Sequence, residues 1–166
     1  MTAGLLVIDK PTGPTSHDVV GRVRRLAGLR RVGHAGTLDP LASGVLLAGL
    51  GPGTRFLEYL VGLDKVYETT VRLGQATTTY DAEGEVTAER PVEATEAQVG
   101  AALDAFRGPI RQRPPAFSAV KQGGRPLYEA ARRGQVVEAK ERDVVIHALD
   151  LLAFDPPLLT LRLACS

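Results

Sequence analysis

A histidine and an aspartate lie close together in a glycine-spaced stretch of the chain, GHAGTLDPLASGVLL, at residues 33–47. Both are residue types that carry acid–base and nucleophilic chemistry. The glycines permit positive φ or the close approach of a ligand, and Pro40 biases Asp39 toward an extended backbone. Asp39 and His34 are therefore candidate site residues. The alternative is that Asp39 only satisfies turn amides, as aspartate side chains commonly do.

The other metal-binding and disulfide-forming residue types are too scattered to build a site together. The chain of 166 residues has one cysteine, Cys165, and three histidines, His17, His34 and His147. This pattern argues against a disulfide framework and against a bound metal, including a zinc-ligand cluster. It fits a reducing, cytoplasmic setting. No apolar run approaches the length of a membrane span and no signal segment is evident, so we expect a cytoplasmic protein with no membrane contact.

Charge is strongly segregated along the chain, although the net charge is only +1. Residues 19–38 hold five arginines and no acid, residues 107–142 hold nine basic and three acidic residues, and residues 81–106 hold seven acids and one arginine. Two basic stretches of this kind are typical of a polyanion-binding face, but charge patterning alone supports two solvated helix faces equally well. The candidate basic residues are Arg22, Arg24, Arg25, Arg30, Arg31, Arg111, Arg113, Lys121, Arg125, Arg132 and Arg133.

The elements that must position these residues follow from apolar periodicity and turn signals. In the first third we expect a buried strand at 4–8 and then a helix that is capped by Thr15 or Ser16, runs to residue 27 and is stopped by Gly28. A turn at 33–42 and a strand at 43–50 should follow. A short helix should come next, with Phe56, Leu57, Leu60 and Val61 inward.

Further along the chain, strands predominate. We expect a strand at 64–74, a polar loop at 75–85, a strand around Val86, a helix with a Thr95–Gln98 capping box, extended arms and loops over 108–134, and adjacent antiparallel strands at 142–154 and 158–165. With 44% hydrophobic residues, the length suits one domain. The predicted fold class is α/β (α+β), with a mixed, mostly antiparallel sheet and flanking helices.

Several separated motifs resemble those of a single enzyme family. The string at 33–47 resembles the signature G-H-x-G-x-L-D-P-x-A-x-G-x-L of the TruB family of pseudouridine synthases. The opening LVIDKPTGPTS at 6–16, DKVY at 64–67 and the Pro, Ser-Ala, Lys, Gly and Tyr-Glu pattern of residues 115–134 resemble further motifs of the same family.

The resemblance implies a fold, an activity and site residues. It implies the pseudouridine synthase fold and isomerisation of uridine 55 in the T loop of tRNA by base flipping, with the tRNA elbow as the partner of a monomeric protein and no cofactor. Asp39 becomes the catalytic carboxylate, which either adds to the base or deprotonates the sugar. Tyr67 would stack on the uracil, His34 would occupy the vacated space, and Lys65 would also contact the substrate.

The chain departs from the family pattern at its end. Cys165 and Ser166 match the opening of a further family motif, and the sequence stops before the arginine of that motif. In relatives, this arginine pairs with the catalytic aspartate. We therefore expect residues 1–166 to be the N-terminal portion of a catalytic domain, with an RNA-gripping insertion at about 107–142. A paired-carboxylate glycosidase is disfavoured because no second acid stands in a recognisable motif. A non-catalytic RNA-binding or tRNA-folding module remains the alternative for this stretch alone.

Overall fold

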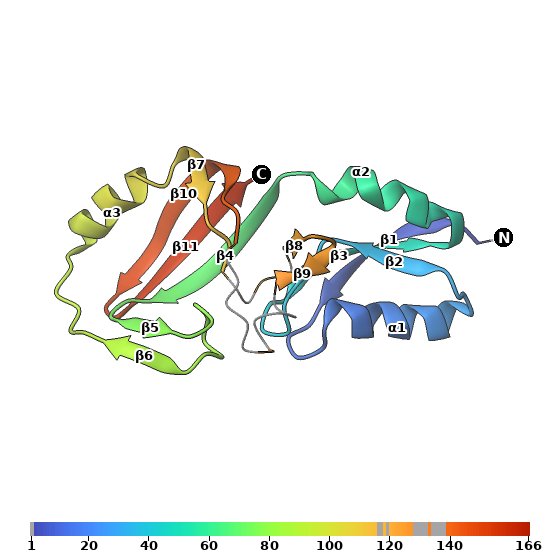
Figure 1. The fold of residues 1–166 in the computed structure, drawn as a ribbon, viewed down its shortest axis with the longest axis horizontal. Helices are drawn as coiled ribbons and strands as arrows, with labels where there is room; N and C mark the ends of the chain where they lie inside the picture. Colours follow the sequence, from blue (N-terminus) through green and yellow to red (C-terminus); the bar gives the residue numbers. More distant parts are fainter. Residues whose placement is uncertain (1, 116–117, 119, 128–132, 134–138) are drawn as a thin grey trace. The chain divides into compact units, whose positions relative to one another are not determined.

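The structure is a computed structural model that describes residues 2–115, 118, 120–127, 133 and 139–166. The chain divides into two compact units, Met1–Leu63 and Asp64–Ser166. Each unit has an antiparallel sheet of its own (Figure 1). The two units contain different candidate residues and are described separately.

The first unit is a three-stranded sheet with helices on both faces. Its elements are β1 (Gly4–Lys10), α1 (Ser16–Ala27), β2 (Val32–Ala35), β3 (Gly44–Leu50), the 3-10 helix η1 (Gly51–Phe56) and α2 (Leu57–Val61). The strand order is β1-β3-β2, with every pair antiparallel. β3 is central because it is the most apolar strand: Leu46, Ala48 and Leu50 are all buried.

Residue size determines how the helices of this unit pack. On one face, Val20 of α1 packs against Val32 and Leu50. On the other face, Gly33 and Gly49 are directly opposite each other in β2 and β3. A Cβ at Gly33 would lie 3.1 Å from Leu57 Cδ1, and one at Gly49 would lie 3.0 Å from Thr54 Cα. This pair of glycines therefore lets η1 and α2 approach the sheet closely.

Local capping sets both ends of α1. The Thr15 hydroxyl accepts from the backbone N–H of Asp18, while the Asp18 carboxylate accepts from the backbone N–H of Thr15. Gly28 ends the helix in the left-handed conformation, with φ of 63°. Thr15 is thus the cap, and the expected helix is confirmed.

The capping box predicts an acid-sensitive contribution to the stability of the first unit. Hydrogen bonds from the Thr15 side chain and backbone hold the pKa of Asp18 below its ordinary value of 3.8. A carboxyl whose pKa is depressed by folding stabilises the folded state above its unfolded pKa and loses that effect as the pH falls through the folded value. We expect Asp18→Asn to lower the urea midpoint at pH 5, and the difference from the native chain to shrink progressively as the pH falls below 3.8. An equal difference at every pH would contradict this.

The second unit is a four-stranded sheet covered on one face by a helix. Its elements are β4 (Lys65–Arg72), β5 (Gln75–Thr77), β6 (Val86–Glu89), α3 (Glu96–Asp104), β7 (Gly108–Gln112), β8 (Lys121–Gln122), β9 (Arg125–Pro126), β10 (Arg142–Asp155) and β11 (Leu158–Cys165). The strand order is β4-β11-β10-β7, and β5–β6 and β8–β9 pair separately. Val99 of α3 packs on Leu149, Leu159 and Leu161 to form the core.

Most of the expected elements are confirmed, including the Thr95–Gln98 capping box of α3 and the antiparallel pairing of β10 with β11. The α+β class with antiparallel sheets and flanking helices is also confirmed.

Several details of the prediction are wrong. Residues 32–35 form a strand rather than part of a turn, residues 75–77 form a strand within the expected polar loop, and β7 pairs with β10 although loops were expected there. Val7 of β1 is 73% exposed rather than buried, and Phe56 and Val61 are 61% and 51% exposed rather than inward. Leu127, Ala130 and Ala131 also predict a short helix that ends at Gly134, and this segment lies mostly outside the described residues.

Candidate active site

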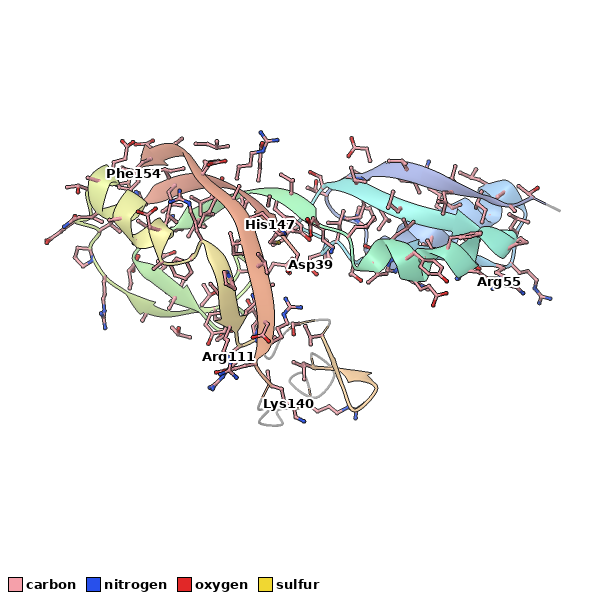
Figure 2. The ribbon with its side chains drawn as sticks, turned by 90° about the horizontal axis from the view of Figure 1, so that it is seen from above. Asp39, Arg55, Arg111, Lys140, His147 and Phe154 are labelled. Carbon is pink, nitrogen blue, oxygen red and sulfur yellow. The ribbon has the colours of Figure 1, made fainter. Side chains whose placement is uncertain are left out.

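Asp39 lies in the loop that joins β2 to β3 in the first unit. This loop is at the end of the sheet opposite to Arg55 (Figure 2). The Asp39 side chain is exposed, and its carboxylate has no hydrogen bond or ion pair to another described residue. Its backbone carbonyl accepts from the Ala42 N–H at 3.0 Å, which closes a turn. The main chain is therefore used in the turn, while the carboxylate remains open to a ligand.

The backbone on both sides of Asp39 is tied to the segment between β1 and α1. The Ser16 hydroxyl donates to the Leu38 carbonyl and accepts from the Leu38 N–H, both at 2.9 Å. On the other side, the Gly13 N–H donates to the Pro40 carbonyl at 2.8 Å.

The segment between β1 and α1 is itself held by Lys10. The Lys10 side chain is fully buried, and its Nζ donates to the carbonyls of Pro11 and Pro14, each at 2.9 Å. The ammonium group is thus desolvated but hydrogen-bonded, as a buried charge must be. The loop that carries Asp39 is therefore hydrogen-bonded to a segment that is itself held by the hydrogen bonds of Lys10.

His34 is a residue of β2 and lies directly opposite the buried Ala48 of β3. The ring is half-buried on the sheet face shared with Val32, because alternate residues of a strand point to the same side. Its Nδ1 lies 2.5 Å from the Gly36 carbonyl oxygen. Because a carbonyl only accepts, Nδ1 is the donor in this contact.

Tyr67 and Lys65 belong to β4 in the second unit. Tyr67 lies opposite Leu163 on the face that also carries Leu159 and Leu161, and 40% of it is exposed. The Tyr67 side chain is therefore partly packed on this face of the sheet and partly accessible, as expected of an aromatic residue at the start of a strand. Lys65 lies opposite Cys165 and is half-buried. The shared family motifs predict that Tyr67 and Asp39 meet in one cleft, and this stays a prediction.

The strand is preceded by a histidine–aspartate contact that the sequence does not indicate. His147 Nε2 of β10 lies 3.3 Å from Asp64 Oδ2, immediately before β4. These residues are 83 positions apart, so no local pattern could have indicated the contact. Asp64 of the DKVY motif thus contacts a residue of β10, which belongs to the same sheet as β4.

The first basic stretch contains two structurally different groups of arginines. Arg24 Nη2 donates to the Val32 carbonyl at 2.8 Å, and Arg31 Nε donates to the Thr54 hydroxyl at 2.7 Å. The side chains of Arg22, Arg25 and Arg30 are exposed and have no hydrogen bond or ion pair within the described part of the chain. These three are therefore the better candidates for contacts with a polyanion.

The second basic stretch is partly neutralised by one glutamate. Arg111 Nη2 and Arg113 Nη2 each lie 3.3 Å from a different oxygen of Glu141. Both arginine side chains remain largely exposed, and Figure 2 shows Arg111 and Lys140 at the end where β10 begins.

Other candidates in this stretch are only partly described. Arg133 is exposed, whereas Arg132 lies outside the described residues. Lys121 and Arg125 stand in the short strands β8 and β9, which are joined through Gly123 and Gly124 at φ of 60° and 82°.

Within the described residues, no group of three or more His, Cys, Asp and Glu side chains could hold a metal ion. No helix in the described part of the chain is long and apolar enough to cross a membrane. A cavity of about 260 Å³ in the second unit is lined by residues 72–75, 89–90, 92 and 156–157, and none of the candidate residues is among them.

Comparison with known families identifies the context of Asp39. Residues 24–166 match the family model of the TruB family pseudouridylate synthase, N-terminal domain. This range includes His34, Asp39, Lys65 and Tyr67. The chain belongs to the TruB family.

Curated relatives from several bacteria agree with this TruB assignment. The chain is 56% identical to tRNA pseudouridine synthase B of Thermobifida fusca over 155 residues, covering 93% of this chain and 53% of the relative. It is 50% identical to the protein of the same name from Pseudomonas paraeruginosa over 164 residues, covering 99% of this chain and 54% of the relative. The chain spans about half the length of the curated relatives it matches.

Solved structures support the pseudouridine synthase fold of this TruB-family chain. A chain in the crystal structure of a Cbf5-Nop10-Gar1 complex matches with a TM-score of 0.73 and 28% identity, covering 98% of this chain and 39% of that one. A chain in the structure of an H/ACA RNP bound to a substrate RNA containing 2'-deoxyuridine has a TM-score of 0.68 at 23% identity, covering 98% and 37%, and supports the fold alone.

Proposed function

We propose that the protein containing this chain isomerises uridine 55 in the T loop of tRNA to pseudouridine, in the cytoplasm and without a cofactor. The relatives named tRNA pseudouridine synthase B support the reaction and the substrate class. The observation that carries the proposal is the placement of Asp39. It is an exposed carboxylate on a loop whose neighbouring residues are hydrogen-bonded in place.

The proposed reaction needs a positioned carboxylate and no redox partner. The N1–C1′ glycosidic bond breaks, the base rotates, and C5 joins C1′. C5 then loses its proton, and N1 gains one. Asp39 either adds to the base or removes a proton from the sugar to start the departure of the base. Both routes use the negative charge and the basicity of the carboxylate.

The proposed base pocket requires a uridine that has left its stack. Flipping costs a few kcal/mol, which stacking on an aromatic ring and displacement by an inserted side chain can offset. Tyr67 would supply the ring, His34 would contact the vacated space, and Lys65 would help to hold the substrate. The partly exposed ring of Tyr67 and the half-buried ring of His34, which the Gly36 carbonyl holds through Nδ1, are compatible with these roles.

In this proposal, residues 1–166 form the N-terminal portion of the catalytic domain. Residues of about 107–142 form the RNA-gripping insertion, which approaches the tRNA elbow. The exposed basic side chains at Arg111, Arg113 and Arg133 support this placement. Recognition would depend on the shape of the T loop and on its unstacked base rather than on duplex sequence.

A defined tRNA T-stem-loop tests the proposed activity. Incubation with the complete protein that contains this chain is expected to convert uridine 55 to pseudouridine, detected by mass spectrometry after chemical derivatisation. A stem-loop with cytidine at position 55 serves as the unreactive control. Tight binding of the uridine stem-loop with no conversion would instead establish an RNA-binding or RNA-folding module.

Salt dependence tests the proposed RNA-binding arginines. Each phosphate contact contributes about −0.7 to −0.9 to the slope of log K against log salt. We expect a variant with Arg22→Gln, Arg25→Gln and Arg30→Gln to bind tRNA more weakly and to have a slope shallower by roughly two to three. Glu83→Gln with Glu85→Gln in the acidic stretch is the matched control. An unchanged slope in the arginine variant would remove this stretch from the interface.

A further inference from the structure

The Ser16 hydroxyl makes an unusually complete contact with the peptide groups next to Asp39. Ser16 is 2% exposed and is the first residue of α1, yet its hydroxyl does not cap that helix, because Thr15 does. Instead it bonds both polar backbone groups of Leu38, which lies 22 residues further along the chain. The hydroxyl thus uses both its donor and an acceptor site on a single residue.

We propose that Ser16 is a positioning residue for the Asp39 carboxylate. This inference rests on the proposed function, in which Asp39 is the catalytic group. The two hydrogen bonds fix the peptide planes on either side of the Leu38 Cα, and the second of these planes leads directly into Asp39. The Gly13–Pro40 hydrogen bond restrains the next residue, so the main chain is held both before and after Asp39. Because the Asp39 side chain has no hydrogen bond or ion pair among the described residues, the backbone contacts are what set the position of its Cα and the direction of the Cα–Cβ bond from which the carboxylate extends.

Because Ser16 is buried, loss of its hydroxyl is expected to displace the loop that carries Asp39. Without the hydroxyl, which belongs to a residue that is 2% exposed, the half-buried Leu38 loses the partner of both its N–H and its C=O. Buried backbone groups require a partner, so residues 36–41 would be expected to shift toward solvent. A displacement of about 1 Å in a catalytic group can lower a rate about a hundredfold.

The test compares chemistry and binding in the complete protein that contains this chain. Ser16→Ala is expected to lower the single-turnover rate of pseudouridine formation about ten- to a hundredfold, while the Kd for tRNA stays within about twofold. Ser16→Cys keeps a weaker donor and acceptor at the same place and is expected to give an intermediate rate. Thr95→Ala, which removes a hydroxyl from the start of α3, is the matched control and is expected to retain the native rate.

The outcomes separate this inference from the proposed function. If the native protein forms no pseudouridine, the proposed function fails first. If the native protein is active and folded Ser16→Ala keeps its rate, or loses rate only in proportion to tRNA binding, the positioning role is overturned. Thermal unfolding followed by circular dichroism establishes that each variant is folded at the assay temperature. If neither Ser16→Ala nor Ser16→Cys is folded, the hydroxyl serves the fold and the positioning role is also overturned.

Discussion

Asp39→Asn is expected to abolish pseudouridine formation while leaving tRNA affinity within about tenfold, or about 1.4 kcal/mol. Asparagine keeps the size of the side chain and much of its hydrogen-bonding capacity in a turn. It removes the negative charge and the basicity on which both proposed routes depend. Because the Asp39 carboxylate has no hydrogen bond or ion pair with a described residue, its loss breaks no contact there. The effect should therefore fall on chemistry rather than on folding.

The chain provides a matched control for the Asp39 variant. Asp155 is also an exposed aspartate that precedes a proline, at the end of β10. Asp155→Asn is expected to keep the native single-turnover rate. Rates are measured with purified complete protein and a T-stem-loop, and mass spectrometry excludes deamidation of the introduced asparagine back to aspartate. Near-native turnover by Asp39→Asn would show that Asp39 is only a turn residue.

Tyr67→Leu is expected to lower the single-turnover rate about ten- to a hundredfold. Stacking of a base on an aromatic ring is worth about 1 to 3 kcal/mol, and leucine keeps apolar contact with the sheet without a flat ring face. Tyr67 lies opposite Leu163 and is partly exposed, so the substitution should cost little stability. Binding of tRNA should weaken as well, because the flipped state loses part of its stabilisation.

Two further tyrosine variants distinguish stacking from other effects of Tyr67. Tyr67→Phe retains the ring, so a rate close to native would assign the effect to stacking, and a large loss would assign it to the hydroxyl. Tyr59→Leu alters an exposed tyrosine of α2 and is expected to have no effect. A native rate for Tyr67→Leu would remove Tyr67 from the proposed base pocket.

Features that depend on neighbouring residues could be predicted from the sequence. The capping boxes at Thr15–Asp18 and Thr95–Gln98 and the left-handed Gly28 involve residues within a few positions of one another. The alternation of Leu159, Thr160 and Leu161 placed β11 correctly for the same reason. The identities of Asp39, His34 and Tyr67 as candidate residues came from motifs that are also contiguous. For these features, local sterics, hydrogen bonding and periodicity act alone.

The tertiary structure decided the features that depend on pairing between distant segments. Residues 32–35 became a strand because β3 supplies the hydrogen-bonding partner, so His34 lies on a sheet face rather than in a turn. Val7 is exposed because no described element covers its side chain, which the apolar composition of β1 could not reveal. Arg24 and Arg31 differ from Arg22 because Val32 and Thr54 offer them acceptors. The bonds of Ser16 to Leu38 span 22 residues, and a hydroxyl carries no sequence signal for a partner that only folding brings within 2.9 Å.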